Sequence, residues 1–291
     1  MDRHKTDIRI AGKPSYFLGL SEITRNKRML SIPLEAGAHS SHGYTGNAGE
    51  VIDLEVMSLK DNSETLNIDV EGSEEIIKLV RPGIVTFGGS LFLFPNSISE
   101  LAKTARDIGS YVVYDAAHVL GLIVGKEFQD PIKEGSDFVT SSTHKTFPGP
   151  QGGLVFGNIR QDGEMTSRME RAVKKIQHAI FPLSTSNTHP RRFPALGVAA
   201  LEMKIFGKAL ASQTVRNAQT AGKARAGDFF TEPNIGIIER LEQSLVGVPL
   251  DRKALRDKIL RSFNGPRLGV IGASVDDFIQ AILTTKEASL A

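Results

Sequence analysis

Continuous apolar runs rich in β-branched residues mark the centre of this chain. They cover Ile84–Phe87, Tyr111–Tyr114 and Phe138–Thr140, and each has the length of a strand that is buried on both faces of a parallel sheet. Between the first two runs, Ile98–Ile108 places apolar side chains at helical spacing. This order predicts the α/β fold class, with a mostly parallel central sheet that is flanked by helices.

The remaining pattern predicts further helices and short strands. Ser97 and Glu100 have the spacing of a capping box, so a helix is predicted to begin directly after Ser97. Residues 51–70 alternate between apolar and polar positions and predict two short strands. Helical spacing predicts four more helices, over Glu71–Leu79, Met165–Ala179, Ala195–Phe206 and Ser274–Leu283. The solvated face of the second is predicted to carry Arg168, Arg171, Lys174 and Lys175.

Changes of composition along the chain predict three parts. Residues 1–30 are polar and lack a periodic pattern, so we expect an N-terminal arm that packs on a partner subunit or on the main domain. Residues 31–207 contain the predicted sheet and form the large domain. From about Lys208 the chain is rich in Ala, Gln, Lys and Arg at helical spacing, and residues 208–291 are predicted to form a smaller α+β C-terminal domain.

The composition excludes several classes of function. With 291 residues, of which 40% are hydrophobic, the chain is long enough for a folded core. Its net charge of +2 comes from interspersed charges and gives no basic stripe for nucleic acid. The absence of cysteine excludes disulfides and thiolate chemistry. Because we find neither a signal peptide nor an apolar stretch of about 18 residues, we expect a cytoplasmic protein with no membrane contact and a small-molecule partner.

Polar clusters follow the predicted strands at the point where each strand ends. Asp115 and His118 follow the second of the three apolar runs, and Ser142, His144 and Lys145 follow the third. Because the carboxyl ends of parallel strands meet at one edge of a sheet, these side chains are predicted to line one pocket. The run of Gly and Pro after the lysine excludes a helix and indicates a constrained loop.

A lysine on a rigid loop beside a carboxylate is the arrangement that pyridoxal 5'-phosphate chemistry requires. The Lys145 amine would bind the cofactor aldehyde as a Schiff base, and Asp115 would keep the pyridine nitrogen protonated, because an adjacent anion favours the cationic form. His118 is predicted to reach the phenolic edge of the ring and His39 to stack on its face. The Ser142 hydroxyl is predicted to bind the phosphate, together with backbone amides at a helix start.

Simpler interpretations of the same residues stay open. Lys145 taken alone is most often a solvent-facing lysine, and His39 and His42 taken alone are packed or surface histidines. The spacing of these two histidines suggests a metal, but no third ligand stands at a suitable position, so no metal is predicted. Ser90 follows two glycines, which is a common turn, and Arg267 could pair with a nearby carboxylate.

Five motifs, taken in their order along the chain, resemble one family. They are G-A-H-S-S-H-G (37–43), G-G-S (88–90), D-A-A-H-V-L-G-L (115–122), S-S-T-H-K-T-F-P-G-P-Q-G-G (141–153) and P-R-L-G (266–269). In these motifs the chain resembles serine hydroxymethyltransferase, a family of fold-type I pyridoxal phosphate enzymes, and Gln151 is similar to the archaeal branch. The resemblance covers residues 34–210 well and the C-terminal part loosely, and it implies a fold-type I transferase-like architecture.

The resemblance also implies a role for each matching residue around the cofactor ring. Lys145 matches the Schiff-base lysine, Asp115 the partner of the pyridine nitrogen, and His118 a further cofactor contact. His39 matches the histidine that is stacked on the ring. These four assignments agree with those made from the residues alone.

Other matching residues stand around the ring and the substrate. Ser90 and Ser142 match cofactor-binding hydroxyls, and Arg267 matches the arginine that binds the substrate carboxylate. An arginine–carboxylate pair is bidentate, so it would fix which bond at Cα lies perpendicular to the ring. His42 and His144 match groups that support the site or handle protons, and His42 is predicted to be catalytic while His144 contacts the cofactor.

The family implies an activity and two alternatives to it. The activity is interconversion of serine and glycine, with transfer of a one-carbon unit to a reduced pterin such as tetrahydrofolate or its archaeal analogue, in a homodimer. The first alternative is a pyridoxal phosphate-dependent aldolase of threonine and related β-hydroxy amino acids, which needs no pterin. The second is a reduced homologue that retains the fold without catalysis.

The chain departs from the family pattern in its N-terminal half. It has no counterpart of the serine motif that binds the cofactor phosphate, nor of an N-terminal tyrosine and glutamate that serve the active site. Arg25–Leu30 runs directly into Ser31–Leu34. Leu183 stands where the family usually has glycine, which argues against a phosphate contact donated across a dimer. We therefore expect either a reduced homologue or a sequence from which family segments are missing.

Overall fold

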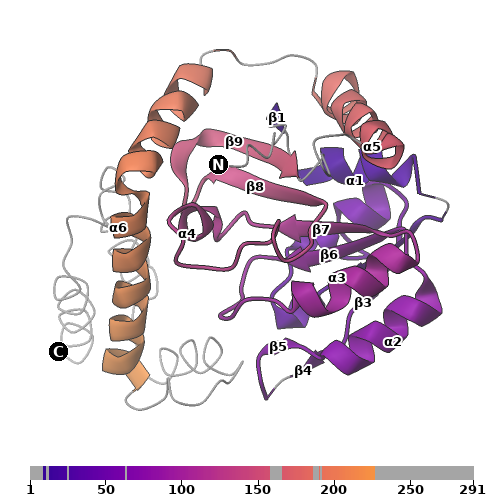
Figure 1. Ribbon diagram of the computed structural model, residues 1–291, viewed down its shortest axis with the longest axis horizontal. Helices are drawn as coiled ribbons and strands as arrows, with labels where there is room; N and C mark the ends of the chain where they lie inside the picture. The colour runs from indigo at the N-terminus through magenta and orange to yellow at the C-terminus, as the bar shows by residue number, and fades with distance from the viewer. Residues whose placement is uncertain are drawn as a thin grey trace, which may run out of the picture.

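The fold is built around a sheet whose strands come from most of the chain. The structure, a computed structural model, describes residues 9–10, 13–24, 26–62, 64–157, 166–185, 190 and 192–226. In these residues the sheet has seven strands in the order β1-β9-β8-β7-β6-β2-β3. Figure 1 shows β9, β8, β7 and β6 at its centre. The strands are β1 Arg9–Ile10, β2 Arg28–Ser31, β3 Glu55–Ser58, β6 Ile84–Gly88, β7 Tyr111–Asp115, β8 Phe138–His144 and β9 Pro148–Gly157.

The pairing of the strands confirms the predicted fold class. All pairs from β8 through β7, β6 and β2 to β3 are parallel, while β9 is antiparallel to β8 and to β1. A separate hairpin pairs β4, Asp61–Asn62, with β5, Asn67–Ile68. The segment 51–70 thus contains three short strands, where two were predicted.

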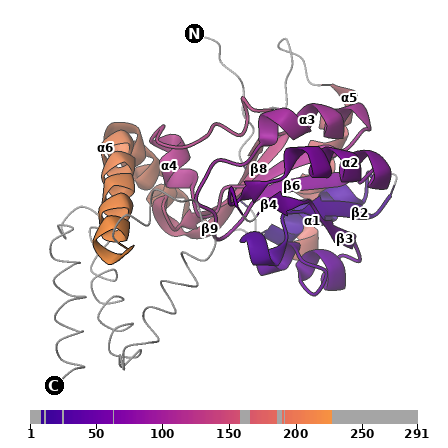
Figure 2. The same cartoon turned by 90° about the horizontal axis from the view of Figure 1, so that it is seen from below.

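Helices cover both faces of the sheet. They are α1 Lys13–Ser21, α2 Val70–Val80, α3 Ile98–Asp107, α4 Leu120–Val124, α5 Ser167–His178 and α6 Arg192–Ala226. Four short 3-10 and π segments are η1 Leu34–Ala36, η2 Ser40–His42, η3 Asn47–Val51 and η4 Ala179–Ser184. Figure 2 shows α2 and α3 on one side of the strands and α1 on the other.

Two apolar layers follow from the alternation of side chains along each strand. Val112 and Tyr114 of β7 point into the layer under α2 and α3, whereas Tyr111 and Val113 point into the layer under α1 and α5. Asp115 continues the second series, so its side chain lies on the α1 face. The burial of both faces explains why the sequence of β7 is apolar without interruption.

Described residues of the segment 1–30 contribute to the core. Helix α1 lies against α5 and η4, and its Phe17 and Leu20 are completely buried in the layer on that face. Strand β2 also begins within this segment, at Arg28. Whether residues 1–30 form a separate arm remains a prediction.

The prediction of a capping box at α3 is wrong. Ser97 occupies the N-cap position, but its side chain makes no capping hydrogen bond. The nearby Ser99 hydroxyl instead donates to Glu100 Oε2 at 2.7 Å, so the carboxylate is bound within the first turn. The start of α3 is set by burial of Ile98 and Leu101 rather than by the cap.

The predicted C-terminal domain lies mostly outside the described residues, which include neither Ser274–Leu283 nor the rest of 227–291. The boundary predicted at residue 208 falls within α6, which is continuous from Arg192 to Ala226 and packs on α4 and β9. The division into domains therefore remains a prediction. None of the helices in the described ranges is both long and apolar enough to cross a membrane.

Candidate active site

The ends of three neighbouring strands stand side by side at the carboxyl edge of the sheet. Gly88 of β6 pairs with Asp115 of β7, and Asp115 pairs with Thr140 of β8. Gly88 has φ +73°, and a Cβ atom there would lie 2.2 Å from the Asp115 carbonyl oxygen. Only glycine allows this backbone conformation and close approach without strain. The three strands are parallel, as predicted, so Gly88 and Asp115 share one edge of the sheet.

Asp115 is fully buried, and each of its carboxylate oxygens has a polar neighbour. Its Oδ1 accepts a hydrogen bond from the Ala117 backbone N–H at 3.0 Å. His42 Nε2 lies 3.0 Å from Oδ2, and the two side chains are 1% and 0% exposed. This second contact has the distance of an ion pair but is not aligned as a hydrogen bond. A ring nitrogen therefore already faces the carboxylate that was predicted to bind a pyridine nitrogen.

His42 is held between the carboxylate and the α1 face of the core. Its ring packs edge to face with Phe17 of α1, at 5.6 Å between centroids. His39 lies next to it, with the ring centroids 6.0 Å apart, and caps segment η2. The Nδ1 atom of His39 is 2.7 Å from the Ser41 hydroxyl and accepts from the Ser41 N–H at 3.1 Å. Both histidines of the H-x-x-H motif thus reach this edge of the sheet.

Lys145 lies in the short connection between β8 and β9, where its amine meets His118. The distance between Lys145 Nζ and His118 Nε2 is 2.8 Å, and both residues are half-buried. Thr146 fixes this contact, because its hydroxyl donates to the His118 carbonyl at 2.8 Å and accepts from the Gly121 N–H at 3.1 Å. The lysine loop and the loop after β7 are therefore joined through backbone and side chains alike.

Ser90 enters the site through its backbone. The N–H groups of Ser90 and Leu91 both donate to the Gly37 carbonyl, at 2.8 and 2.9 Å. Gly37 has φ +97°, and a Cβ atom there would lie 1.5 Å from the Leu91 oxygen. This contact fixes the loop that carries the two histidines against the end of β6.

Other predicted site residues lie farther from these contacts or outside the structure. Ser142 pairs with Gly153 of β9 and is half-buried. His144 is exposed, and its Nδ1 accepts from the Gly152 N–H at 3.3 Å, which places it in the β8–β9 hairpin. Arg267 lies outside the described residues. The roles of all these side chains toward a cofactor remain predictions.

Buried polar atoms gather on the face of Asp115. Thr140 of β8 pairs with Asp115, and Thr86 of β6 pairs with Val113, two residues before Asp115 on the same face; both side chains are buried. Their hydroxyls and the His42 Nδ1 atom have no hydrogen-bond partner among the described residues. Because buried polar groups are normally paired, this face of the sheet is built for more polar contacts than the described residues supply.

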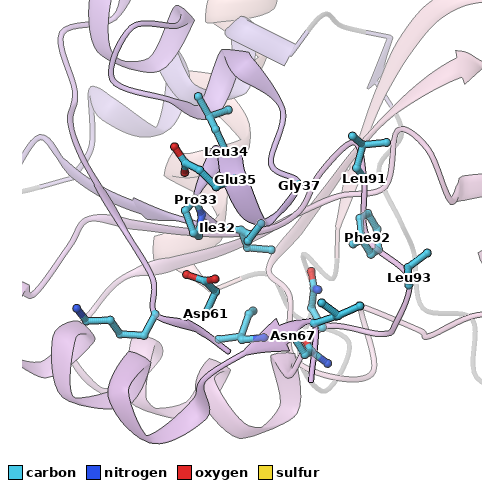
Figure 3. A pocket seen from close by; sticks show the side chains of 15 residues that line it. Ile32, Pro33, Leu34, Glu35, Gly37, Asp61, Asn67, Leu91, Phe92 and Leu93 are labelled. Atoms are coloured by element: carbon cyan, nitrogen blue, oxygen red, sulfur yellow. Dashed lines mark hydrogen bonds between the residues drawn. The ribbon is translucent and has the colours of Figure 1, made fainter. Parts of the chain in front are cut away.

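A cleft of about 190 Å³ lies beside the site. Figure 3 shows Leu34 and Glu35 on one wall, Leu91 to Leu93 on another, and Asp61 and Asn67 below. Gly37 lines the cleft, and its carbonyl holds Ser90, so the cleft and the candidate site share one loop.

Several residues that build the site were missed by sequence reasoning. Phe17 stands in a segment without clear periodicity, and nothing in the sequence links it to His42. Thr146 directly follows Lys145 in the T-H-K-T motif, so the motif itself contained the signal. The Ala117 amide serves Asp115 through a turn within D-A-A-H, where only side chains had been considered.

The fold and the site together define an α/β protein with a lysine, a buried aspartate and three histidines at the carboxyl edge of a mostly parallel sheet. Comparison with known families is specific: the model of the serine hydroxymethyltransferase family matches residues 15–228. The chain belongs to the serine hydroxymethyltransferase family, and its sheet has the fold-type I architecture expected from the motifs.

Curated archaeal relatives agree with this assignment. Serine hydroxymethyltransferase of Staphylothermus marinus is 44% identical over 199 residues, which cover 68% of this chain and 43% of the relative. That of Sulfolobus acidocaldarius is 44% identical over 198 residues, with shares of 68% and 43%. That of Pyrococcus furiosus is 44% identical over 214 residues, with shares of 74% and 48%. The matched region spans about half the length of these relatives.

The described residues contain no group of three or more histidine, aspartate or glutamate side chains that could hold a metal ion. The pair of His39 and His42 is accounted for by contacts with Ser41 and with Asp115.

Proposed function

We propose that this chain is a pyridoxal 5'-phosphate-dependent serine hydroxymethyltransferase. It interconverts serine and glycine and passes the one-carbon unit to a reduced pterin, as a cytoplasmic transferase of one-carbon metabolism. The observation that carries the proposal is the contact of Lys145 Nζ with His118 Nε2 at 2.8 Å. His118 follows the buried Asp115 by three residues. Family membership and the names of the archaeal relatives support it.

The residues present fit the cofactor chemically. Lys145 offers an amine for the aldehyde, and Asp115 offers a buried anion that already faces the ring nitrogen of His42. Each carboxylate oxygen has two lone pairs, so Oδ2 can accept from a pyridine nitrogen while His42 stays close. The hydroxyls of Thr86 and Thr140, which have no partner in the described residues, add polar capacity beside it.

Each residue has a distinct task. Lys145 would hold the cofactor through its amine. Asp115 would keep the pyridine nitrogen protonated, because a nearby anion favours the cationic form of a base. When bound, pyridoxal phosphate supplies an electron sink for the negative charge left at the substrate Cα. His118, in contact with the Lys145 amine, is placed to move a proton to or from it.

Ser90, His39 and Ser142 are proposed to contact the cofactor, as the motifs imply. Arg267 is proposed to bind the substrate carboxylate through a bidentate pair, which orients the substrate over the ring. A homodimer is proposed from the family resemblance. Exposed Phe181 and Leu183 of η4 fit a further interface, since large apolar side chains in the open are often contact surfaces.

The test is a serine turnover assay with purified chain, pyridoxal phosphate and tetrahydrofolate. We expect glycine formation that requires the pterin and is abolished by Lys145→Ala. Lys133→Ala is the matched control, because that lysine is exposed and pairs only locally with Asp130. Turnover of threonine without pterin, and none of serine with it, would instead identify an aldolase. Absence of both activities in a folded chain would identify a non-catalytic homologue.

A further inference from the structure

A buried amide pair joins two loops next to the candidate site. Gln129, in the segment after α4, faces Asn96, in the loop between β6 and α3. Asn96 N–H donates to Gln129 Oε1 at 2.9 Å, and Gln129 Nε2 donates to the Asn96 carbonyl at 3.1 Å. Both side chains are buried. The backbone of Asn96 is thus held at its donor and at its acceptor by one side chain.

Gln129 has every group of its amide engaged. Besides Asn96, its Oε1 accepts from the Tyr114 hydroxyl at 2.9 Å, and its Nε2 donates to Glu134 Oε2 at 2.5 Å. Burial raises the pKa of Tyr114, so its hydroxyl stays protonated and remains a donor. Tyr114 precedes Asp115 in β7, which brings the network to the strand that ends in the site. A fully satisfied buried network of this kind allows one arrangement only.

The network reaches the site through Asn96. Its Oδ1 accepts a hydrogen bond from the Gly88 N–H at 2.7 Å. Gly88 is the last residue of β6 and pairs with Asp115. Asn96 therefore holds the end of this strand by accepting its last N–H.

The loop between Gly88 and Asn96 is fastened along its length. Ser90 donates to the Gly37 carbonyl, which belongs to the segment before His39. Phe92 packs on Phe128, directly before Gln129, with ring centroids 5.9 Å apart. Figure 3 shows Phe92 and Gly37 on the walls of the same cleft. A shift of Asn96 would therefore move the Ser90 loop and the histidine loop together.

We propose that Gln129 is a positioning residue of the candidate site. By holding Asn96 it fixes the end of β6 and the Ser90 loop, and through Gly37 it fixes the loop of His39 and His42. Strong binding of the cofactor depends on this arrangement. The identity of the ligand in this inference rests on the proposed function, whereas the hydrogen-bond network is observed independently of it.

The test compares pyridoxal phosphate binding by the parent chain, Gln129→Met and Asn96→Ala. Gln129→Met keeps the volume of the side chain and removes all of its hydrogen bonds. We expect the cofactor Kd, measured by absorbance titration well below the melting temperature, to rise about tenfold in each variant. The double variant should bind no more weakly than the weaker single variant, because both changes break the same connection.

A matched control separates positioning from general stability. Ser110→Ala removes a buried hydrogen bond, from the Ser110 hydroxyl to the Pro82 carbonyl at 2.6 Å, at the opposite end of β7. It should lower the melting temperature and leave the cofactor Kd within about twofold. If Gln129→Met behaves like Ser110→Ala, the inference is overturned.

Amide hydrogen exchange on the cofactor-free chain keeps the two proposals apart. We expect faster exchange at Gly88 and Ser90 in Gln129→Met and unchanged exchange there in Ser110→Ala. A parent chain that binds no pyridoxal phosphate would contradict the proposed function, while exchange would still decide the positioning role. Unchanged protection of both amides in Gln129→Met would overturn that role.

Discussion

Asp115 and Asp137 stand at opposite edges of the sheet and have different neighbours. The Asp115 side chain is fully buried, whereas that of Asp137 is 11% exposed. Asp137 lies just before β8, where its Oδ2 accepts from the Val112 N–H at 2.9 Å. Nη1 of Arg168, in α5, lies 4.0 Å from the same carboxylate oxygen. Asp115 ends β7 at the other edge, where it faces His42, and the next loop brings His118 against Lys145.

The partners of Asp137 are structural groups. The Arg168 guanidinium stacks over the Tyr111 ring at 3.9 Å and donates to the Ser110 carbonyl at 2.5 Å, so the cation is itself fixed to the strand. Arg168 was predicted to lie on a solvated face of its helix, and this prediction is wrong, because the side chain packs on β7. The face prediction holds for Lys174, which is exposed and pairs with Glu170 of the same helix.

The comparison shows that burial of a carboxylate does not by itself mark a site. At the N-terminal edge the neighbours are a backbone amide and a guanidinium, neither of which exchanges a proton in the neutral range. At the carboxyl edge they are imidazoles and an amine, which are side chains that act as general acids, bases and nucleophiles in enzymes. The open α/β sheet thus separates a structural end from a chemical end.

The largest expected difference between the two edges of the sheet is that between Asp115→Asn and Asp137→Asn. We expect Asp115→Asn to lower kcat/KM for serine about 10²- to 10³-fold, because the pyridine nitrogen loses its anionic partner. Asp137→Asn keeps an acceptor for the Val112 N–H and should stay within about threefold of the parent. Steady-state kinetics with pterin present checks both. Equal losses would mean that the two ends do not differ in function.

His42→Leu should reveal the linkage of Asp115 to the histidine loop in the absence of cofactor. The buried carboxylate loses its imidazole neighbour, so we expect the free energy of unfolding to fall by about 2–4 kcal/mol. His144→Leu changes an exposed histidine and should stay within about 0.5 kcal/mol. Urea unfolding of the cofactor-free chain measures both. If His42→Leu left the free energy of unfolding unchanged, the contact with Asp115 would contribute nothing to folding.

Gly109 and Gly88 both have positive φ and lie at opposite edges of the sheet, so alanine substitutions there compare the two edges with a smaller expected effect. Gly109→Ala, at the N-terminal edge, meets nothing within 4 Å and should cost about 1 kcal/mol for the backbone conformation alone. Gly88→Ala also forces a Cβ into the Asp115 backbone, so its cost should be about 2–3 kcal/mol. Only Gly88→Ala should weaken cofactor binding. Urea unfolding measures the stability of both variants, and absorbance titration measures their cofactor Kd. A larger loss in Gly109→Ala than in Gly88→Ala would contradict this expectation.

The smallest effect concerns the pH dependence of stability at Asp137. Burial raises the pKa of Asp137 above its usual value, while the Val112 N–H and the Arg168 and Arg106 cations act in the opposite direction. A carboxyl whose folded pKa is raised contributes its stability at low pH and loses it as pH rises through the folded pKa.

The Asn side chain of Asp137→Asn does not titrate. The melting temperature of this variant, relative to that of the parent, should therefore increase as the pH rises from about 4 to 7. Thermal melts of both chains across this range provide the check. A variant that instead falls behind the parent with rising pH would show a carboxylate whose pKa is lowered by Arg168.

The sequence predicted the strands of the chemical end because their burial on both faces removes polar residues. β6, β7 and β8 begin at the predicted residues, although β8 extends to His144. The run P-G-P-Q-G-G was interpreted as a loop from its composition, but it forms the first half of β9. In the described residues β1 reaches only Leu154 and Val155, so the prolines stand on an open edge where no ladder donor is needed.

The individual contacts of the site were less predictable than its location. The order of strands gave the shared edge of Gly88, Asp115 and Lys145. His42, in contrast, meets Asp115 across 73 residues of sequence, and Phe17 meets His42 from a segment read as an arm. Such contacts depend on how the layers pack, which periodicity does not encode. The Gln129 network was invisible for the same reason.

The most direct test of the account is an absorbance spectrum of the purified chain with pyridoxal phosphate, recorded beside that of Lys145→Ala, before and after glycine is added. We predict a band of covalently bound cofactor in the parent that is missing from the variant and that shifts when glycine binds. Identical spectra from the two chains, or a parent spectrum that ignores glycine, would contradict the claim that the carboxyl edge is a catalytic site.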